Sequence, residues 1–338
     1  MIGSDGAVIE HRSYARVGLL GNPSDVYNGR TISFSLGNFW AQVRLEPSEN
    51  LSILPHPALD LLQFDSLPHL LLTIEAFVFV WLCFWIMGFS NSFSAGVVSN
   101  DVDLNLWLIG YKLMVIMEGY VCSWQFVKFS TIIAMKMASD YIWGTLHWLT
   151  ILTFPASCLL DFYQVRHLIN VEVRPNLILN AEKELGIVAG LQDRVAQVYE
   201  GLVYMDFNKK HMEDFGHGEY IPMDEGLLPP LYLIYAENPS DSGKVHSTVR
   251  QRWLNGEKFI ISSMEEVASI ALEGRTALLE KDYTKYASLM NRNFDLRRQM
   301  FGDDSLGALN IKMVEIARRV GAASKFTGSG GAVVVFCP

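Results

Sequence analysis

A long stretch with very little charge lies in the middle of this chain and limits what the chain can fold into. Residues 66–157 carry 8 of the 63 charged side chains, although they make up 92 of the 338 residues. Within this stretch, residues 76–100 form 25 consecutive positions without a charge, and residues 141–160 form another 20. Apolar stretches of this length are candidates for crossing a bilayer. The two flanking parts, in contrast, have the composition of an ordinary globular protein.

Three interpretations of this apolar segment are open. Membrane spans explain its hydropathy, but its flanks carry Asp101, Asp103 and Asp140 instead of the Lys/Arg clusters that orient a span. A buried core segment is the second interpretation. The third is a retained intron or mispredicted exon, because thymine-rich codons specify Phe, Leu, Val, Ile, Cys, Trp, Tyr and Ser. Residues 72–155 lack a clear helix or strand period, so under this interpretation they specify no single packing.

The remaining composition excludes several classes of protein. A formal net charge of −9, with no Lys/Arg run interleaved with aromatics, argues against nucleic acid as a partner. The 4 cysteines have neither zinc-ligand nor disulfide-framework spacing, which is typical of a reducing compartment. The first 16 residues contain no apolar run of signal-peptide length. We therefore predict a cytoplasmic protein, although the apolar segment leaves membrane contact open.

The flanking parts mix strand and helix patterns. Short apolar runs separated by turn residues predict strands within residues 7–57 and at residues 231–235. Apolar positions spaced by three and four residues predict helices, which we place at residues 180–185, 192–202, 262–279 and 285–298. This mixture indicates an α+β fold.

A glycine-rich motif lies close to the end of the sequence. Residues 325–332 read KFTGSGGA and are followed by the apolar run 333–336. Small residues let backbone N–H groups approach a ligand closely, commonly an anion. A tight turn that leads into a strand explains the same residues equally well.

Two further motifs bring polar residues to the edge of regular elements. Asp193 follows a loop with two glycines and begins a helix, where a carboxylate can accept a proton from a substrate hydroxyl or can cap the helix. Arg16 lies on a predicted strand that runs into the polar loop containing Asn22, Asp25 and Tyr27. Such a loop can bind a sugar or can be a plain surface turn.

The order of these motifs resembles that of the GHMP kinase superfamily, and their amino-acid sequences resemble those of its plant-type glucuronokinases. The resemblance covers about residues 9–71 and 156–338, with phrases such as GNPSDVY, LQDRVAQ and YAENPSDSGK. It implies a two-domain fold: an N-terminal domain over residues 1–227, interrupted by the aberrant segment 72–155, and a ferredoxin-like C-terminal domain over residues 228–338. Members of this superfamily normally continue through a further helix and strand, so the resemblance implies an incomplete C-terminal domain.

The resemblance also implies an activity and a set of site residues. The activity is ATP-dependent phosphorylation of a sugar acid, D-glucuronate, to D-glucuronate 1-phosphate, which feeds UDP-glucuronate synthesis. Asp193 is similar to the family's catalytic base, Arg16 to the cation that steadies the phosphate, and Glu182 to the Mg²⁺ carboxylate. Asn22, Asp25 and Tyr27 would face the sugar. The ATP-binding residues implied by the glycine-rich motif are Lys325, Thr327, Gly328, Ser329, Gly330 and Gly331.

One motif of the superfamily is missing from the sequence. The main ATP loop has the form PxxxGLxSSA and belongs just before Cys158, where the sequence instead reads WLTILTFP. This replacement has no glycine or serine that could wrap phosphates at a helix N-terminus. We therefore expect little or no kinase activity from the chain as written. The alternative is a non-catalytic protein derived from a GHMP kinase, either membrane-inserted or soluble.

Overall fold

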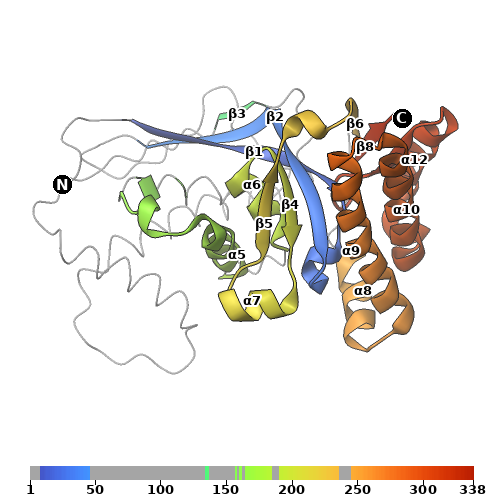
Figure 1. Cartoon of the computed structure of the whole chain (residues 1–338), viewed down its shortest axis with the longest axis horizontal. Coiled ribbons are helices and arrows are strands. Elements are labelled where there is room, and N and C mark those ends of the chain that lie inside the picture. The colour runs from blue at the N-terminus through green and yellow to red at the C-terminus, as the bar shows by residue number, and fades with distance from the viewer. Residues whose placement is uncertain are drawn as a thin grey trace, which may run out of the picture.

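The computed structural model describes two β-sheets and the helices packed on them (Figure 1). The described residues are 8–45, 134–136, 157, 160–161, 164–184, 190–235 and 245–338. Most of the apolar segment 72–155 thus lies outside the description, as do the three predictions made for it. Its one described piece is the short strand β3, Ala134–Lys136, which pairs antiparallel with β2.

The first sheet is antiparallel and has the order β1-β2-β4-β5. The strands in this order are β1 (Ile9–Leu20), β2 (Arg30–Leu45), β4 (Leu202–Asp206) and β5 (Glu219–Met223), and β3 belongs to the same sheet through its pairing with β2. The outer half of β1 alternates between more and less exposed side chains, whereas its last four residues are all buried. A strand that changes from one covered face to two in this way leads from the edge of a domain into its core.

The second sheet is also antiparallel and has the order β6-β8-β7. Its strands are β6 (Leu231–Tyr235), β7 (Ala323–Phe326) and β8 (Ala332–Phe336). The central strand β8 is buried along its whole length, as its unbroken apolar sequence AVVVF predicts. The turn between β7 and β8 holds the glycine-rich motif.

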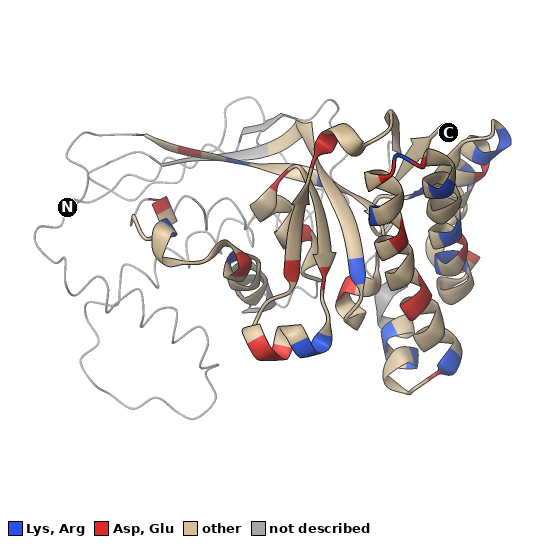
Figure 2. Ribbon diagram, viewed as in Figure 1, with Lys and Arg blue, Asp and Glu red and all other residues tan. Residues whose placement is uncertain are grey.

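Helices pack on both sheets: α5 to α7 and α9 lie beside the first sheet, and α10 and α12 pack on the second (Figure 1). Their bounds are α5 Arg174–Glu184, α6 Gln192–Tyr199, α7 Lys209–Phe215, α8 Val245–Leu254, α9 Lys258–Leu279, α10 Tyr283–Phe301, α11 Asp303–Leu306 and α12 Ala308–Arg319. Four short 3-10 turns are η1 Ser24–Tyr27, η3 Arg166–Leu168, η4 Val171–Val173 and η5 Glu225–Leu227. Figure 2 shows that charged residues of both signs lie along α9, α10 and α12.

The largest hydrophobic cluster among the described residues joins the two sheets. It includes Leu20 and Ile32 of the first sheet, Val333 of the second and Ala271 of α9. Helix α9 packs directly on the first sheet at Gly274, where an added Cβ would lie 2.1 Å from Leu20 Cδ1. The predicted domain boundary falls between β5 and β6, and the core continues across it.

The structure confirms the α+β mixture and refines several elements. Strand β6 has the predicted bounds, and α9 and α10 contain the predicted helices 262–279 and 285–298. The helix predicted over residues 192–202 was wrong at its end. Glu200 and Gly201 both have a φ of 56°, which stops the helix and lets β4 begin at Leu202. None of the helices within the described ranges combines the length and apolarity needed to cross a bilayer.

Candidate active site

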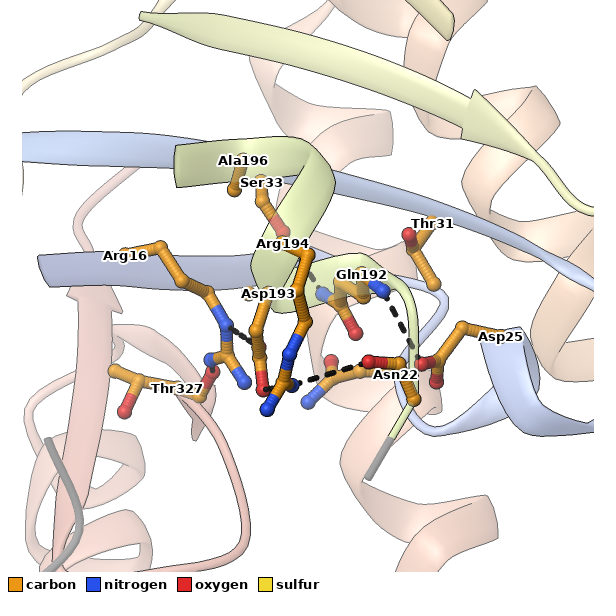
Figure 3. Close-up of polar contacts among 12 residues, drawn as sticks. Arg16, Asn22, Asp25, Thr31, Ser33, Gln192, Asp193, Arg194, Ala196 and Thr327 are labelled. Atoms are coloured by element: carbon orange, nitrogen blue, oxygen red, sulfur yellow. Dashed lines mark hydrogen bonds and ion pairs between the residues drawn. The ribbon is translucent and has the colours of Figure 1, made fainter. Parts of the chain in front are cut away.

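The three predicted motifs meet where the first sheet approaches the turn between β7 and β8 (Figure 3). Gly18 on β1 donates its amide hydrogen to the Thr327 carbonyl oxygen at 2.8 Å. A Cβ on Gly18 would lie 2.7 Å from that oxygen, so the approach requires glycine. Strand β1 thus brings Arg16 and the loop that follows it against the glycine-rich turn, although the two motifs are about 310 residues apart in sequence.

Asp193 and Arg16 form an ion pair at the centre of this junction (Figure 3). The Arg16 guanidinium donates to Asp193 Oδ1 and also to the Thr327 carbonyl. Arg194 Nη1 donates to Asp193 Oδ2 at 3.3 Å. Both partners of the central pair are mostly buried, with side-chain exposures of 11% and 12%. Hydrogen bonds from two guanidinium groups fix the orientation of the carboxylate.

The alternative role of Asp193 as a helix cap does not fit its contacts. Helix α6 begins at Gln192, its N-cap residue is Leu191, and no side chain caps it. The Asp193 side chain instead points from the first turn toward Arg16 (Figure 3). The carboxylate therefore lies in the site. Its two oxygens can accept more hydrogen bonds than the two that the arginines donate.

Asp25 lies next to the start of the same helix. Its Oδ2 atom accepts a hydrogen bond from the Gln192 amide at 3.4 Å. Burial and the nearby Asp193 charge together raise the pKa of the Asp25 carboxyl to about 6. Gly190 gives this carboxylate its space, because an added Cβ would lie 1.9 Å from Asp25 Oδ2. Two carboxylates therefore flank the first turn of α6 in different electrostatic environments.

Asn22 is held by Lys325. The buried Lys325 ammonium donates to Asn22 Oδ1 at 2.6 Å, to the Gly18 carbonyl at 2.8 Å and to the Phe326 carbonyl at 2.5 Å. Burial, together with the charges of Arg297 and Arg16, holds the pKa of Lys325 well below its usual value. All three ammonium hydrogens thus face protein oxygens, and the Asn22 amide group is oriented with its oxygen toward Lys325.

Tyr27 connects the sugar-loop candidates to helix α8. Its ring meets the Trp253 ring edge-on, with centroids 5.4 Å apart, and the residue is 8% exposed. Burial raises the pKa of the Tyr27 hydroxyl, and the nearby Asp25 carboxylate also raises it. The three predicted sugar-binding residues therefore share one loop but have different surroundings.

The glycine-rich turn is anchored from both sides. Asn310 accepts the Gly331 amide at 2.9 Å, and Gly331 has a left-handed φ of 77°. Gly328 lies beside Arg16, since a Cβ there would be 3.3 Å from Arg16 Nη1. Arg297 on α10 donates to the Ser329 carbonyl at 3.3 Å. Arg297 was missed in the sequence because it lies in an ordinary amphipathic helix with no motif around it.

The described residues at the turn offer donors that suit an anion. The predicted metal ligand Glu182 lies in α5, and its side chain is outside the described part of the structure. Within the described ranges, His, Cys, Asp and Glu side chains form no group of three or more that could hold a metal ion by themselves. Arginine groups and backbone amides at the turn, in contrast, are the donors that phosphate oxygens accept.

The sequence of the chain is similar to those of two known proteins. No family model matches the chain. It is 60% identical over 332 residues to Glucuronokinase 1 of Arabidopsis thaliana, covering 98% of this chain and 86% of that protein. It is 58% identical over 337 residues to Probable glucuronokinase 2 of the same organism, covering 99% of this chain and 86% of that protein.

Solved structures share the fold at much lower sequence identity. L. major mevalonate kinase in complex with R-mevalonate superposes with a TM-score of 0.63 at 15% identity, covering 99% of this chain and 89% of that one. Lactococcus lactis galactokinase complexed with galactose superposes with a TM-score of 0.59 at 14% identity, covering 99% and 87%. These likenesses confirm the predicted α+β fold class.

Proposed function

The chain belongs to the glucuronokinase family, and we propose that its reaction transfers the γ-phosphoryl group of ATP to the anomeric hydroxyl of D-glucuronate. The products are D-glucuronate 1-phosphate and ADP, and the first of them serves UDP-glucuronate synthesis. The observation that carries this proposal is the mostly buried Asp193 carboxylate, fixed by Arg16 beside the glycine-rich turn.

In this reaction Asp193 is the general base. The proton of the sugar O1 hydroxyl passes to an Asp193 carboxylate oxygen as the O1–P bond forms and the bond from phosphorus to the ADP oxygen breaks. Arg16 holds the carboxylate in place through Nε and lies beside Gly328 at the turn. Its positive charge stabilises the negative charge of the transferring phosphoryl group.

The sugar binds on the loop that follows β1. Asn22 donates a hydrogen bond through its Nδ2 group, because Lys325 occupies its oxygen. Asp25, with its pKa raised to about 6 by burial, accepts or donates a hydrogen bond to a sugar hydroxyl depending on pH. Tyr27 closes this side of the site against Trp253.

ATP binds with its phosphates toward the turn formed by Thr327, Gly328, Ser329, Gly330 and Gly331. Lys325 supports this turn from beneath, since its ammonium is held by Asn22 and backbone carbonyls. When bound, Mg²⁺ neutralises phosphate charge, and Glu182 is the residue that would hold it. Among the described residues, no cluster of carboxylates marks the position of that ion.

We further propose that the chain as written turns over slowly. The Gly/Ser-rich phosphate loop expected before Cys158 is replaced by WLTILTFP, which lies outside the described residues. Each charge-assisted hydrogen bond lost from such a loop costs about 1.5–3 kcal/mol of phosphate binding. Sequencing the transcript across residues 67–161 tests the origin of the segment. A message that restores a Gly/Ser-rich loop supports an intron, and abundant message for the apolar segment contradicts it.

A segment exchange separates the site from the missing loop. In a hybrid protein, residues 72–155 are replaced by the aligned segment of the Arabidopsis thaliana relative. We expect ADP release by the hybrid with D-glucuronate, much less with D-glucose, and a severe loss in the Asp193→Asn hybrid. ADP release by the unmodified chain equal to that of the hybrid would refute the slow turnover. A folded but inactive hybrid would refute the kinase reaction and favour a non-catalytic protein.

A further inference from the structure

Arg297 is a buried cation without a counterion in the described part of the chain. It lies on α10 and is only 3% exposed. Among the described residues its one hydrogen bond runs from Nη2 to the Ser329 carbonyl at 3.3 Å, while its Nε atom is buried without a partner. Burying an arginine without a carboxylate is costly, so such a group indicates a ligand that supplies the missing charge.

The groups packed around Arg297 do not supply a negative charge. Its guanidinium lies over the rings of Phe301 and Phe326, at 5.3 and 5.5 Å from their centroids. Burial and the positive charge of Arg16 together lower the pKa of Arg297 to about 10. Aromatic faces attract a cation only weakly, and a neighbouring cation opposes it.

The excess of positive charge extends under the whole turn. Three mostly buried cations gather there: Arg16, Arg297 and Lys325. Asp193 pairs with both Arg16 and Arg194, whereas the described partners of Lys325 are oxygens of uncharged groups. In a protein with a formal net charge of −9, this local excess stands out. A field of this kind favours an anion above the turn.

Backbone amides of the turn between β7 and β8 offer further hydrogen-bond donors to an anion. Among the described residues, the amides of Gly328 and Gly330 have no hydrogen-bond acceptor, whereas the Thr327 and Gly331 amides are bound by Ala332 and Asn310. Successive amides in a turn with left-handed glycine backbone form a concave anion site. The free donors therefore lie in the part of the turn that Arg297 contacts.

We propose that Arg297, with the amides of Gly328 and Gly330, binds a phosphoryl group at the turn between β7 and β8. This inference rests on the proposed function, in which a phosphoryl group passes between ATP and the sugar at this turn. Arg16 then orients the base Asp193, and its positive charge is partly balanced by that carboxylate. Arg297 supplies a further positive charge to the phosphoryl group. Phosphate is favoured over the sugar carboxylate because backbone amides and a guanidinium surround it together.

The test measures binding of inorganic pyrophosphate to the full chain by isothermal titration calorimetry. This probe needs neither the sugar nor kinase turnover, so an inactive chain still gives a decisive result. Arg297→Met removes the charge, and Arg297→Lys keeps it but loses the planar donor fork. The matched control is Arg292→Met, which removes an exposed arginine of the same helix that pairs with Glu266.

We expect Arg297→Met to weaken pyrophosphate binding about 10- to 100-fold, as loss of a charge-assisted contact predicts, and Arg292→Met to leave it unchanged. Arg297→Lys should lie between these two. The melting temperature of ligand-free Arg297→Met should equal or exceed that of the unmodified protein, because an uncompensated buried charge is removed.

Several results would overturn the proposal. One is an unmodified chain that does not bind pyrophosphate. Another is Arg297→Met with unchanged pyrophosphate affinity and a lower melting temperature, which would make the guanidinium a structural contact of Ser329. Weakened D-glucuronate binding with intact pyrophosphate binding would assign Arg297 to the sugar carboxylate instead. If Arg297→Met does not fold, Arg297→Lys decides between the same outcomes.

Discussion

Replacing Asp25 with asparagine should make the protein more stable near neutral pH. Burial, assisted by the charge of Asp193, raises the pKa of Asp25 from 3.8 to about 6 in the folded protein. A raised pKa means that the folded state favours the protonated carboxyl. The stabilisation by that proton is complete below about pH 4 and is lost as the pH rises through about 6.

The size of the effect follows from the shift. A difference of about 2 pKa units corresponds to about 3 kcal/mol at about pH 7.5, where Asp25 is ionised in both states. At about pH 5 the folded carboxyl is mostly protonated and the unfolded one mostly ionised, which leaves about 1.5 kcal/mol. Asp25→Asn has no charge to bury. It should therefore gain these amounts relative to the unmodified protein, with the larger gain at the higher pH.

Urea denaturation at the two pH values measures the free energy of unfolding of both proteins. Tyr27→Phe is the matched control in the same 3-10 turn, because the pKa of Tyr27 is raised above its ordinary value of 10.0 and the residue does not titrate in this range. Its difference from the unmodified protein should be equal at both pH values. An Asp25→Asn gain that is absent, or that grows as the pH falls, would refute the reasoning.

Two further substitutions test the contacts around the ion pair. Lys325→Met leaves the buried Asn22 and Gly18 oxygens without their donor, so we expect a loss of about 1–3 kcal/mol in the free energy of unfolding, measured by urea denaturation. An unchanged stability would mean that water replaces the ammonium. Asp193→Asn in the active hybrid should lower kcat about 10²- to 10⁴-fold with little change in the ATP KM, because proton acceptance is lost. A kcat within threefold of the parent would exclude Asp193 as the base.

The fold was predictable where periodicity is strong. Helices α9 and α10 repeat apolar residues at helical spacing, and strand β6 is a compact apolar run between turn residues. Strand β4 was missed, because four of its five residues are buried and it shows no alternation. Strand β4 also follows two residues with positive φ. The apolar spacing from which the helix was predicted gives no information about such backbone angles.

The site was predictable where a motif carried it. Asp193 and Arg16 were chosen from separate phrases of the sequence, and the structure joins them in one ion pair. Lys325 was chosen for phosphate, yet its ammonium contacts Asn22 and backbone oxygens, a placement that depends on burial. Arg297 carries no sequence signal, because Ser329, its hydrogen-bond partner among the described residues, is 32 residues away in the sequence and is brought close by the fold.

The identity of the phosphorylated product tests the central claim most directly. The hybrid protein is incubated with ATP, Mg²⁺ and D-glucuronate, and the sugar product is examined by ¹H and ³¹P NMR. We predict a phosphorus coupling to the anomeric proton, which places the phosphate on O1, and loss of this product in the Asp193→Asn hybrid. Phosphate on another hydroxyl, or no sugar phosphate from a folded hybrid that binds ATP, would contradict the account.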